Sequence, residues 1–95
     1  MLYEPSPNRL CLLRKQHGLS QKQLASLTGL DRTMISIYER GRTLPTFASA
    51  AMFQIIFGLN VADIFPALFR ELEAELESKE RKLGRRLLGR RAEMP

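Results

Sequence analysis

The stretch "SQKQLASLTGLDRTMISIYERGR", residues 20–42, decides the fold. Ser20 and Gln23 have the S-x-x-Q spacing of a capping box, in which the two residues satisfy each other's backbone amides at the start of a helix. Gly29 can end that helix after about two turns, because glycine readily takes the left-handed conformation found at helix ends. Asp31 can cap a second short helix and Gly41 can end it. The stretch therefore predicts two short helices joined by a tight turn.

Each of these two helices has one predicted buried face, since apolar residues recur at helical spacing. Ala25 is small enough to let the helices approach closely, and an inward Ile35 leaves the opposite side of the second helix facing out. A helix-turn-helix of this shape can place its second helix in a DNA major groove while the first crosses the backbone. The predicted inward residues are Leu24, Ala25, Thr28, Ile35 and Tyr38, and the outward ones are Arg32, Thr33, Ser36 and Ile37.

Helical signals continue on both sides of this stretch. Asn8 can cap a helix that runs to about Gln16. Thr46 can cap a helix over residues 47–57, and "VADIF" (61–65) forms a short one. Pro66 can start a long last helix that reaches roughly residue 88. No strand alternation is visible, so the predicted fold is all-α. The predicted parts are an N-terminal arm (1–7), a helix-turn-helix DNA-binding domain (8–65) and a charged C-terminal helix and tail (66–95).

Composition limits the class of protein. The chain has 95 residues, 44% of them hydrophobic, which suits one packed domain with an appendage. A net charge of +5 favours a polyanionic partner, although an ordinary soluble surface is equally compatible with it. Cys11 is the only cysteine and His17 the only histidine, so we expect no internal disulfide, no metal centre and no cofactor. No nucleophile with a positioned base and no paired acids are visible, so we do not expect an enzyme.

The sequence also bears on location. The start "MLYEPSPNRL" lacks the basic and apolar segments of a signal peptide, and no segment approaches about 18 apolar residues in a row. We therefore expect a cytoplasmic protein that does not enter a membrane.

Five stretches of the chain together match a known pattern: "LR" (13–14), "GLSQKQLA" (18–25), "G" (29), "MISIYERGRTLP" (34–45) and "FGLNVADIF" (57–65). In these residues the chain resembles the Xre/Cro-like, phage-repressor-like helix-turn-helix family. The resemblance covers roughly residues 8–65, and it implies a five-helix repressor-like domain from a bacterium or phage that binds double-stranded DNA.

The resemblance also implies roles for particular residues. Bases would be read by Arg32, Thr33 and Ile37. Phosphates would be held by Gln21, Ser36, Arg40, Arg42 and Thr43. Arg14 and Glu39 match an ion pair that ties the first helix to the recognition helix. Ile37 departs from the family because it cannot make a side-chain hydrogen bond; it either packs on a thymine methyl or is a helix-packing residue. Asp31 places a negative charge beside the expected DNA surface.

The fourth predicted helix and the last one carry apolar residues that need a cover. An apolar seam along the last helix is interrupted at Lys79, and acidic residues (71–80) precede basic ones (81–91), which suits the helix macrodipole. The last helix can cover the fourth within one chain, or both can form a dimer interface, and the sequence leaves both open. The basic run "RKLGRRLLGRR" is a solvated helix end or a non-specific DNA contact. The predicted packing residues are Met52, Ile55, Ile56, Phe69, Leu72 and Leu76, with Leu83 and Leu87 continuing the seam.

The function expected from these observations is sequence-specific DNA binding by a transcriptional regulator. We expect a repressor that binds an inverted-repeat operator as a homodimer, because two half-sites double the contacts of one small domain. The alternative is an antitoxin or another protein-interaction module that uses residues 66–95 to bind a small partner protein.

Overall fold

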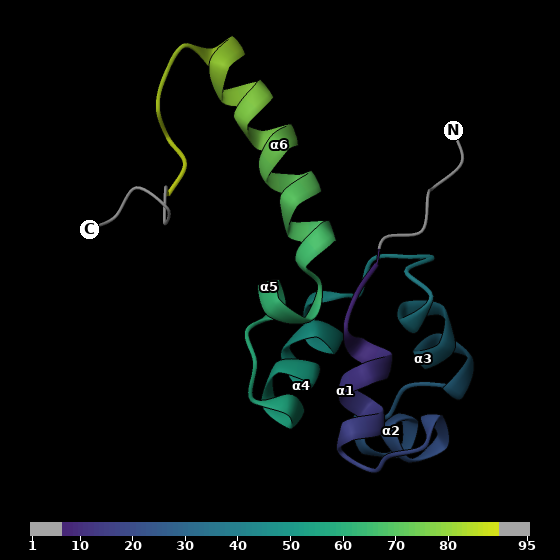
Figure 1. Ribbon diagram of the computed structural model, residues 1–95. Helices are drawn as coiled ribbons and strands as arrows, with labels where there is room; N and C mark the ends of the chain where they lie inside the picture. Colours follow the sequence, from purple (N-terminus) through teal and green to yellow (C-terminus); the bar gives the residue numbers. More distant parts are fainter. Residues whose placement is uncertain (1–6, 90–95) are drawn as a thin grey trace.

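The computed structural model describes residues 7–89, and within them the chain is helical with no strand (Figure 1). The predicted all-α fold is therefore confirmed. Residues 1–6 of the predicted N-terminal arm, together with Arg90 and Arg91 of the basic run, lie outside the described residues. The helices are α1 (Leu10–Gln16), α2 (Gln21–Thr28), α3 (Arg32–Glu39), α4 (Phe47–Phe57), α5 (Val61–Ile64) and α6 (Pro66–Leu83).

The first five helices enclose one hydrophobic core. Tyr38 of α3 meets Phe53 of α4 edge to face, with ring centroids 6.0 Å apart. All five residues predicted to point inward from α2 and α3 are buried there. Because both helices give one face to this core, their opposite faces are free to carry the site. The buried apolar residues are Leu10, Leu13, Leu24, Ala25, Ile35, Tyr38, Phe53, Phe57, Ile64 and Phe65.

The local signals at the helix ends are largely met. Ser20 Oγ accepts from the backbone N–H of Gln23 at 3.0 Å, and Gln23 Oε1 accepts from the N–H of Ser20 at 2.8 Å, which completes the predicted capping box. Gly29 ends α2 with φ 73°, the left-handed conformation that the turn requires. Asp31 differs from the expectation: it stands at the N-cap of α3 with an extended backbone, but its side chain makes no capping hydrogen bond.

Helix α6 projects from the five-helix body (Figure 1). Its first turns are anchored because Phe65 is buried and Leu68 packs against the core. Beyond these first turns, which adjoin α5, the helix extends away from the body and does not lie along α4. Of the two arrangements left open by the sequence, the cover of α4 by α6 within one chain is thus not the one adopted. Within residues 7–89, no helix has the length and apolar character needed to cross a bilayer.

The end of α6 corrects the prediction of a helix to residue 88. The helix ends at Leu83, and Gly84 takes φ 75°. The chain then turns back, and the Glu80 carboxylate accepts hydrogen bonds from the backbone N–H groups of Leu87 and Leu88. A glycine in the left-handed conformation followed by a side-chain acceptor for the next amides ends a helix effectively. Leu87 therefore does not continue the helical seam.

Candidate nucleic-acid interface

Helix α3 is held rigidly by its inner face. Ile35 is fully buried and Tyr38 nearly so, both against the core. The backbone oxygen of Tyr38 also accepts a hydrogen bond from Asn8 Nδ2 at 2.8 Å, which ties the end of α3 to the start of α1. A helix fixed in this way presents its other side in a constant orientation, as recognition of a rigid groove requires.

The outer side of α3 carries what we call the outward face, formed by Arg32, Thr33, Ser36 and Ile37. These residues are spaced three and four apart and so lie on one side of the helix. Arg32 and Thr33 are exposed, whereas Ser36 and Ile37 are half-buried. The face begins with polar side chains at the start of the helix and becomes more apolar one turn later. Half-burial of Ile37 leaves part of this side chain able to contact another molecule.

The orientation of α3 relative to α1 and α2 depends on a polar network centred on Glu39. Arg14 Nε and Nη2 donate to the two carboxylate oxygens of Glu39, the second at 3.3 Å, so the ion pair implied by the family resemblance is present. Gln21 Nε2 donates to the same carboxylate at 3.0 Å. Arg14 Nη1 also donates to the backbone oxygen of Leu19 at 2.8 Å. One carboxylate thus joins α1, the start of α2 and the end of α3.

The electrostatics of this Glu39 network favour the charged forms. Burial alone would raise the pKa of Glu39, but the hydrogen bonds from Arg14 and Gln21 and the charge of Arg14 together hold it below its ordinary value. The hydrogen bond to Glu39 raises the pKa of Arg14 against the opposing effect of burial. The side chains of Arg14 and Glu39 are only 9% and 6% exposed, so the pair is largely shielded from solvent.

Gln21 has a role that its predicted phosphate contact did not include. Its amide nitrogen is engaged by Glu39, a residue 18 positions away, and this contact fixes the direction of the side chain at the first residue of α2. The carboxamide oxygen and the helix N-terminus remain suited to the neighbourhood of a phosphate. The position of Gln21 at the helix start predicts a phosphate contact, but nothing in the local sequence predicts the contact with Glu39.

Three further candidates for phosphate contacts follow the recognition helix. Arg40, Arg42 and Thr43 are all exposed. Gly41 is buried with φ 67°, and the N–H of Arg42 donates to the backbone oxygen of Ile37 at 3.1 Å. This tight turn keeps Arg42 beside the end of α3. Arg40 Nε donates to the backbone oxygen of Ser36 at 3.3 Å, so its guanidinium lies along the same helix.

The side chains of Cys11 and His17 both contact neighbouring residues of the helical body. Cys11 Sγ accepts from Arg14 Nη2 at 3.6 Å. The His17 ring lies edge-on to Phe57 with centroids 4.9 Å apart, and its Nδ1 lies 3.0 Å from the backbone oxygen of Leu13. No group of three or more metal-binding side chains occurs within residues 7–89.

The residues predicted for helix packing divide into two groups. Met52 and Ile56 are half-buried, and Ile56 packs against the core of its own chain. Ile55 is 80% exposed on α4. Phe69, Leu72 and Leu76 are exposed on α6, and Leu83 continues their line. Phe47, at the start of α4, is also highly exposed, and the sequence analysis did not single it out.

Comparison with known proteins identifies relatives of the helical body. The helix-turn-helix family matches residues 12–64, which span nearly all of α1 to α5. The HTH-type transcriptional regulator PuuR of Escherichia coli (strain K12) is 33% identical over 57 residues, 60% of this chain and 31% of PuuR. An uncharacterized HTH-type transcriptional regulator of Methanocaldococcus jannaschii is 34% identical over 58 residues, 61% of this chain and 88% of that protein.

These matches cover only part of this chain and only part of PuuR. The stretch shared with PuuR covers about a third of the length of PuuR, and the family match ends before α6 begins. The named relatives are transcriptional regulators rather than enzymes, in agreement with the expectation from the sequence that this chain is not an enzyme.

Proposed function

This chain belongs to the helix-turn-helix family, in its Xre/Cro-like group, and from that premise we propose that it is a sequence-specific DNA-binding transcriptional regulator. The observation that carries the proposal is the outward face of α3, mounted on a buried scaffold that fixes its direction. An α-helix fits the major groove of B-DNA, where each base pair offers a distinct pattern of hydrogen-bonding groups. Recognition then depends on the side chains that α3 presents.

In the proposed complex, three residues of α3 read bases. Arg32 is suited to a guanine, whose O6 and N7 accept two parallel hydrogen bonds from a guanidinium. Thr33 can hydrogen-bond to a base edge. The partly exposed Ile37 packs on a thymine methyl group, because its side chain has no polar atom to offer a base.

A second set of residues holds the phosphates on either side of the groove. Gln21 approaches one strand from the start of α2, with its side chain directed by Glu39. Arg42 and Thr43 approach the backbone from the loop after α3, with Ser36 and Arg40 as lesser contributors. Such contacts position the protein and supply salt-dependent affinity without reading sequence.

We propose that the protein acts as a homodimer on an inverted repeat. One α3 offers few base contacts, and a two-fold dimer doubles them on half-sites about one helical turn apart. The exposed apolar residues of α6, with Ile55 of α4, supply surface that burial against a second copy would stabilise. A dimer bound across a promoter blocks the access of other proteins to it, so the proposed outcome is repression. The proposed location is the cytoplasm, because that compartment holds the DNA.

The test is selection of binding sites from random duplex DNA by the full chain, followed by measured affinities at fixed salt. We expect an enriched inverted repeat and a preference over random DNA of at least about a thousandfold. Arg32→Ala should remove the preference at one base pair of each half-site. Arg70→Ala, which removes an exposed arginine from α6, is the matched control and should leave the preference intact. Recovery of no common sequence would refute the proposal.

The exposed α6 also favours a second candidate. Residues 66–95 would bind a small partner protein, as in an antitoxin, while the helix-turn-helix binds DNA. This candidate predicts a hetero-complex of fixed stoichiometry in place of the homodimer. Sedimentation of the protein purified with its neighbouring gene product distinguishes the two.

A further inference from the structure

The exposed side of α6 carries an apolar stripe, formed by Phe69, Leu72, Leu76 and Leu83. These side chains are 38%, 40%, 49% and 61% exposed, respectively. Their steps of three, four and seven residues are those of a heptad repeat, with Lys79 at the one polar position in the seam. The turn after Gly84 leaves Leu83 uncovered, so the stripe is accessible along its length.

Lys79 is compatible with a helix partner on this stripe. Its ammonium is already paired with Glu75 one turn earlier, at 3.2 Å. The aliphatic stem can then lie across a neighbouring apolar side chain while the charge stays at the edge with Glu75. The seam therefore continues through this position.

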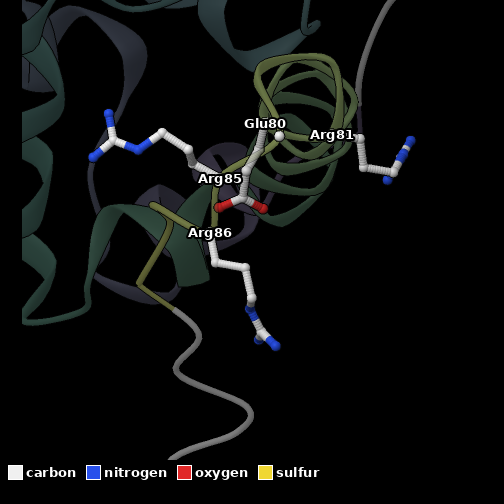
Figure 2. A pocket seen from close by; sticks show the side chains of 5 residues that line it. Glu80, Arg81, Arg85 and Arg86 are labelled. Carbon is white, nitrogen blue, oxygen red and sulfur yellow. The ribbon is translucent and has the colours of Figure 1, made fainter.

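Charge along α6 changes sign towards its end. The acidic residues Glu71, Glu73, Glu75 and Glu77 form a segment in the middle of the helix, and Arg81 and Lys82 lie at its end. Arg85 and Arg86 follow in the turn that doubles back. Figure 2 shows that the guanidinium groups of Arg81, Arg85 and Arg86 point away from one another, so they do not converge on a single small anion. They instead spread positive charge around the end of the helix.

We propose that α6 pairs with α6 of a second copy of this chain in antiparallel orientation. This inference rests on the homodimer proposed above and specifies its geometry. In the antiparallel register that aligns the stripe, Leu72 lies opposite Leu83 of the other copy, and Leu76 opposite Lys79. The positions that flank the seam then bring Glu75 of each copy beside Lys82 of the other. The basic end of each helix lies along the acidic segment of its partner.

The parallel arrangement is disfavoured by the same residues. It sets the two acidic segments side by side and the two basic ends side by side, and it separates Glu75 of each copy from Lys82 of the other. Like charges brought together in this way work against pairing. In the antiparallel register Glu73 also faces Glu80, but the Glu80 carboxylate accepts two backbone hydrogen bonds from its own chain and is 7% exposed. Its charge is therefore directed inward rather than at the partner.

The orientation can be tested by disulfide cross-linking of the full chain. Two single-cysteine proteins, Leu72→Cys and Leu83→Cys, are made in a Cys11→Ser background, and one carries a tag that changes its size. After mixing and mild oxidation, we expect the cross-linked species to join the two different proteins, because only seam positions that face each other approach closely enough for a disulfide. Cross-links that join two copies of the same variant, at both positions, would mean parallel pairing and would overturn the inference.

Two other outcomes separate this inference from the proposed function. A stable dimer with no cross-link would place the interface elsewhere and overturn the inference, while leaving the homodimer in place. A monomer that still binds its selected DNA would overturn both the orientation and the homodimer. Sequence-specific DNA binding would survive in either case.

A charge exchange provides a second measurement that does not depend on cysteine. Glu75→Lys should weaken dimerisation by about tenfold, because each dimer holds two of these exposed pairs and each contributes modestly. Adding Lys82→Glu to the same chain should restore the dimer to within about threefold. Glu77→Lys, which removes an acid from another side of the helix, is the matched control and should have little effect. Failure of Lys82→Glu to restore the dimer would overturn the register.

Discussion

Replacing Glu39 by alanine should destabilise this protein far more than replacing an exposed glutamate does. The substitution leaves Arg14 charged, buried and without its partner, and it also removes the acceptor for Gln21. Breaking a buried ion pair by removing one partner costs about 3–5 kcal/mol. Arg14 keeps its hydrogen bond to the Leu19 oxygen, so we expect a value at the lower end of this range.

The measurement is urea unfolding of the full chain at pH 7, followed by circular dichroism at one fixed protein concentration, since dimerisation would couple stability to concentration. Glu77→Ala is the matched control, because it removes the same residue type from an exposed position on α6 outside the proposed seam. This control should change the free energy of unfolding by no more than about 0.5 kcal/mol. Equal destabilisation by the two substitutions would refute the reasoning from burial.

The same residue predicts the direction of the pH dependence. The pKa of Glu39 is lower in the folded protein than the ordinary value of a glutamate, because the hydrogen bonds from Arg14 and Gln21 outweigh the effect of burial. The stability that this group contributes is therefore fully present above the unfolded pKa and is lost as pH falls through the folded one. The wild-type protein should lose stability below about pH 4.5, and Glu39→Gln should show a weaker dependence in that range. A steeper acid dependence in Glu39→Gln would contradict the sign of the shift.

Three other predictions follow from the site and from α6. Arg32→Ala should cost about 1–3 kcal/mol on the selected DNA and much less on random DNA, whereas an equal loss on both would make Arg32 a phosphate contact. Arg42→Ala should weaken binding uniformly and reduce the slope of log affinity against log salt by about one unit per monomer, and an unchanged slope would remove it from the interface. A chain ended after Arg70 keeps Leu68 on the core but loses most of the apolar stripe, so sedimentation should show a monomer with weaker operator binding; a stable dimer of undiminished affinity would place the interface within the first five helices.

The fold was predictable from the sequence where local chemistry decides the structure. Ser20 and Gln23 form the expected capping box, and Gly29 and Gly58 end their helices in the left-handed conformation. The end of α6 was not predictable, because Gly84 lies between good helix formers and glycine costs only about 1 kcal/mol inside a helix. The turn at Gly84 is stabilised by the Glu80 carboxylate, which accepts hydrogen bonds from the backbone N–H groups of Leu87 and Leu88.

The exposed side of the candidate site was predictable from the sequence, but the contacts between distant residues were not. Helical spacing identified which side of α3 faces out, because that side is the complement of the buried one. The contact between Gln21 and Glu39 joins residues 18 positions apart, and no local pattern encodes it. The same limit applies to Asp31, whose position at the N-cap was correct but whose side chain makes no capping bond.

The Glu39 network makes the orientation of α3 independent of the exposed side chains that α3 presents. Within the described residues, the side chains of Arg32 and Thr33 take no part in the hydrogen bonds that fix α3 against α1 and α2. Changes at these two positions can therefore accumulate without loss of the helix orientation, so under the proposed function the preferred DNA sequence can change one base pair at a time. For the same reason, a combinatorial library that varies only these positions should yield folded proteins with altered targets, whereas a library that varies Glu39 should yield proteins of lower stability.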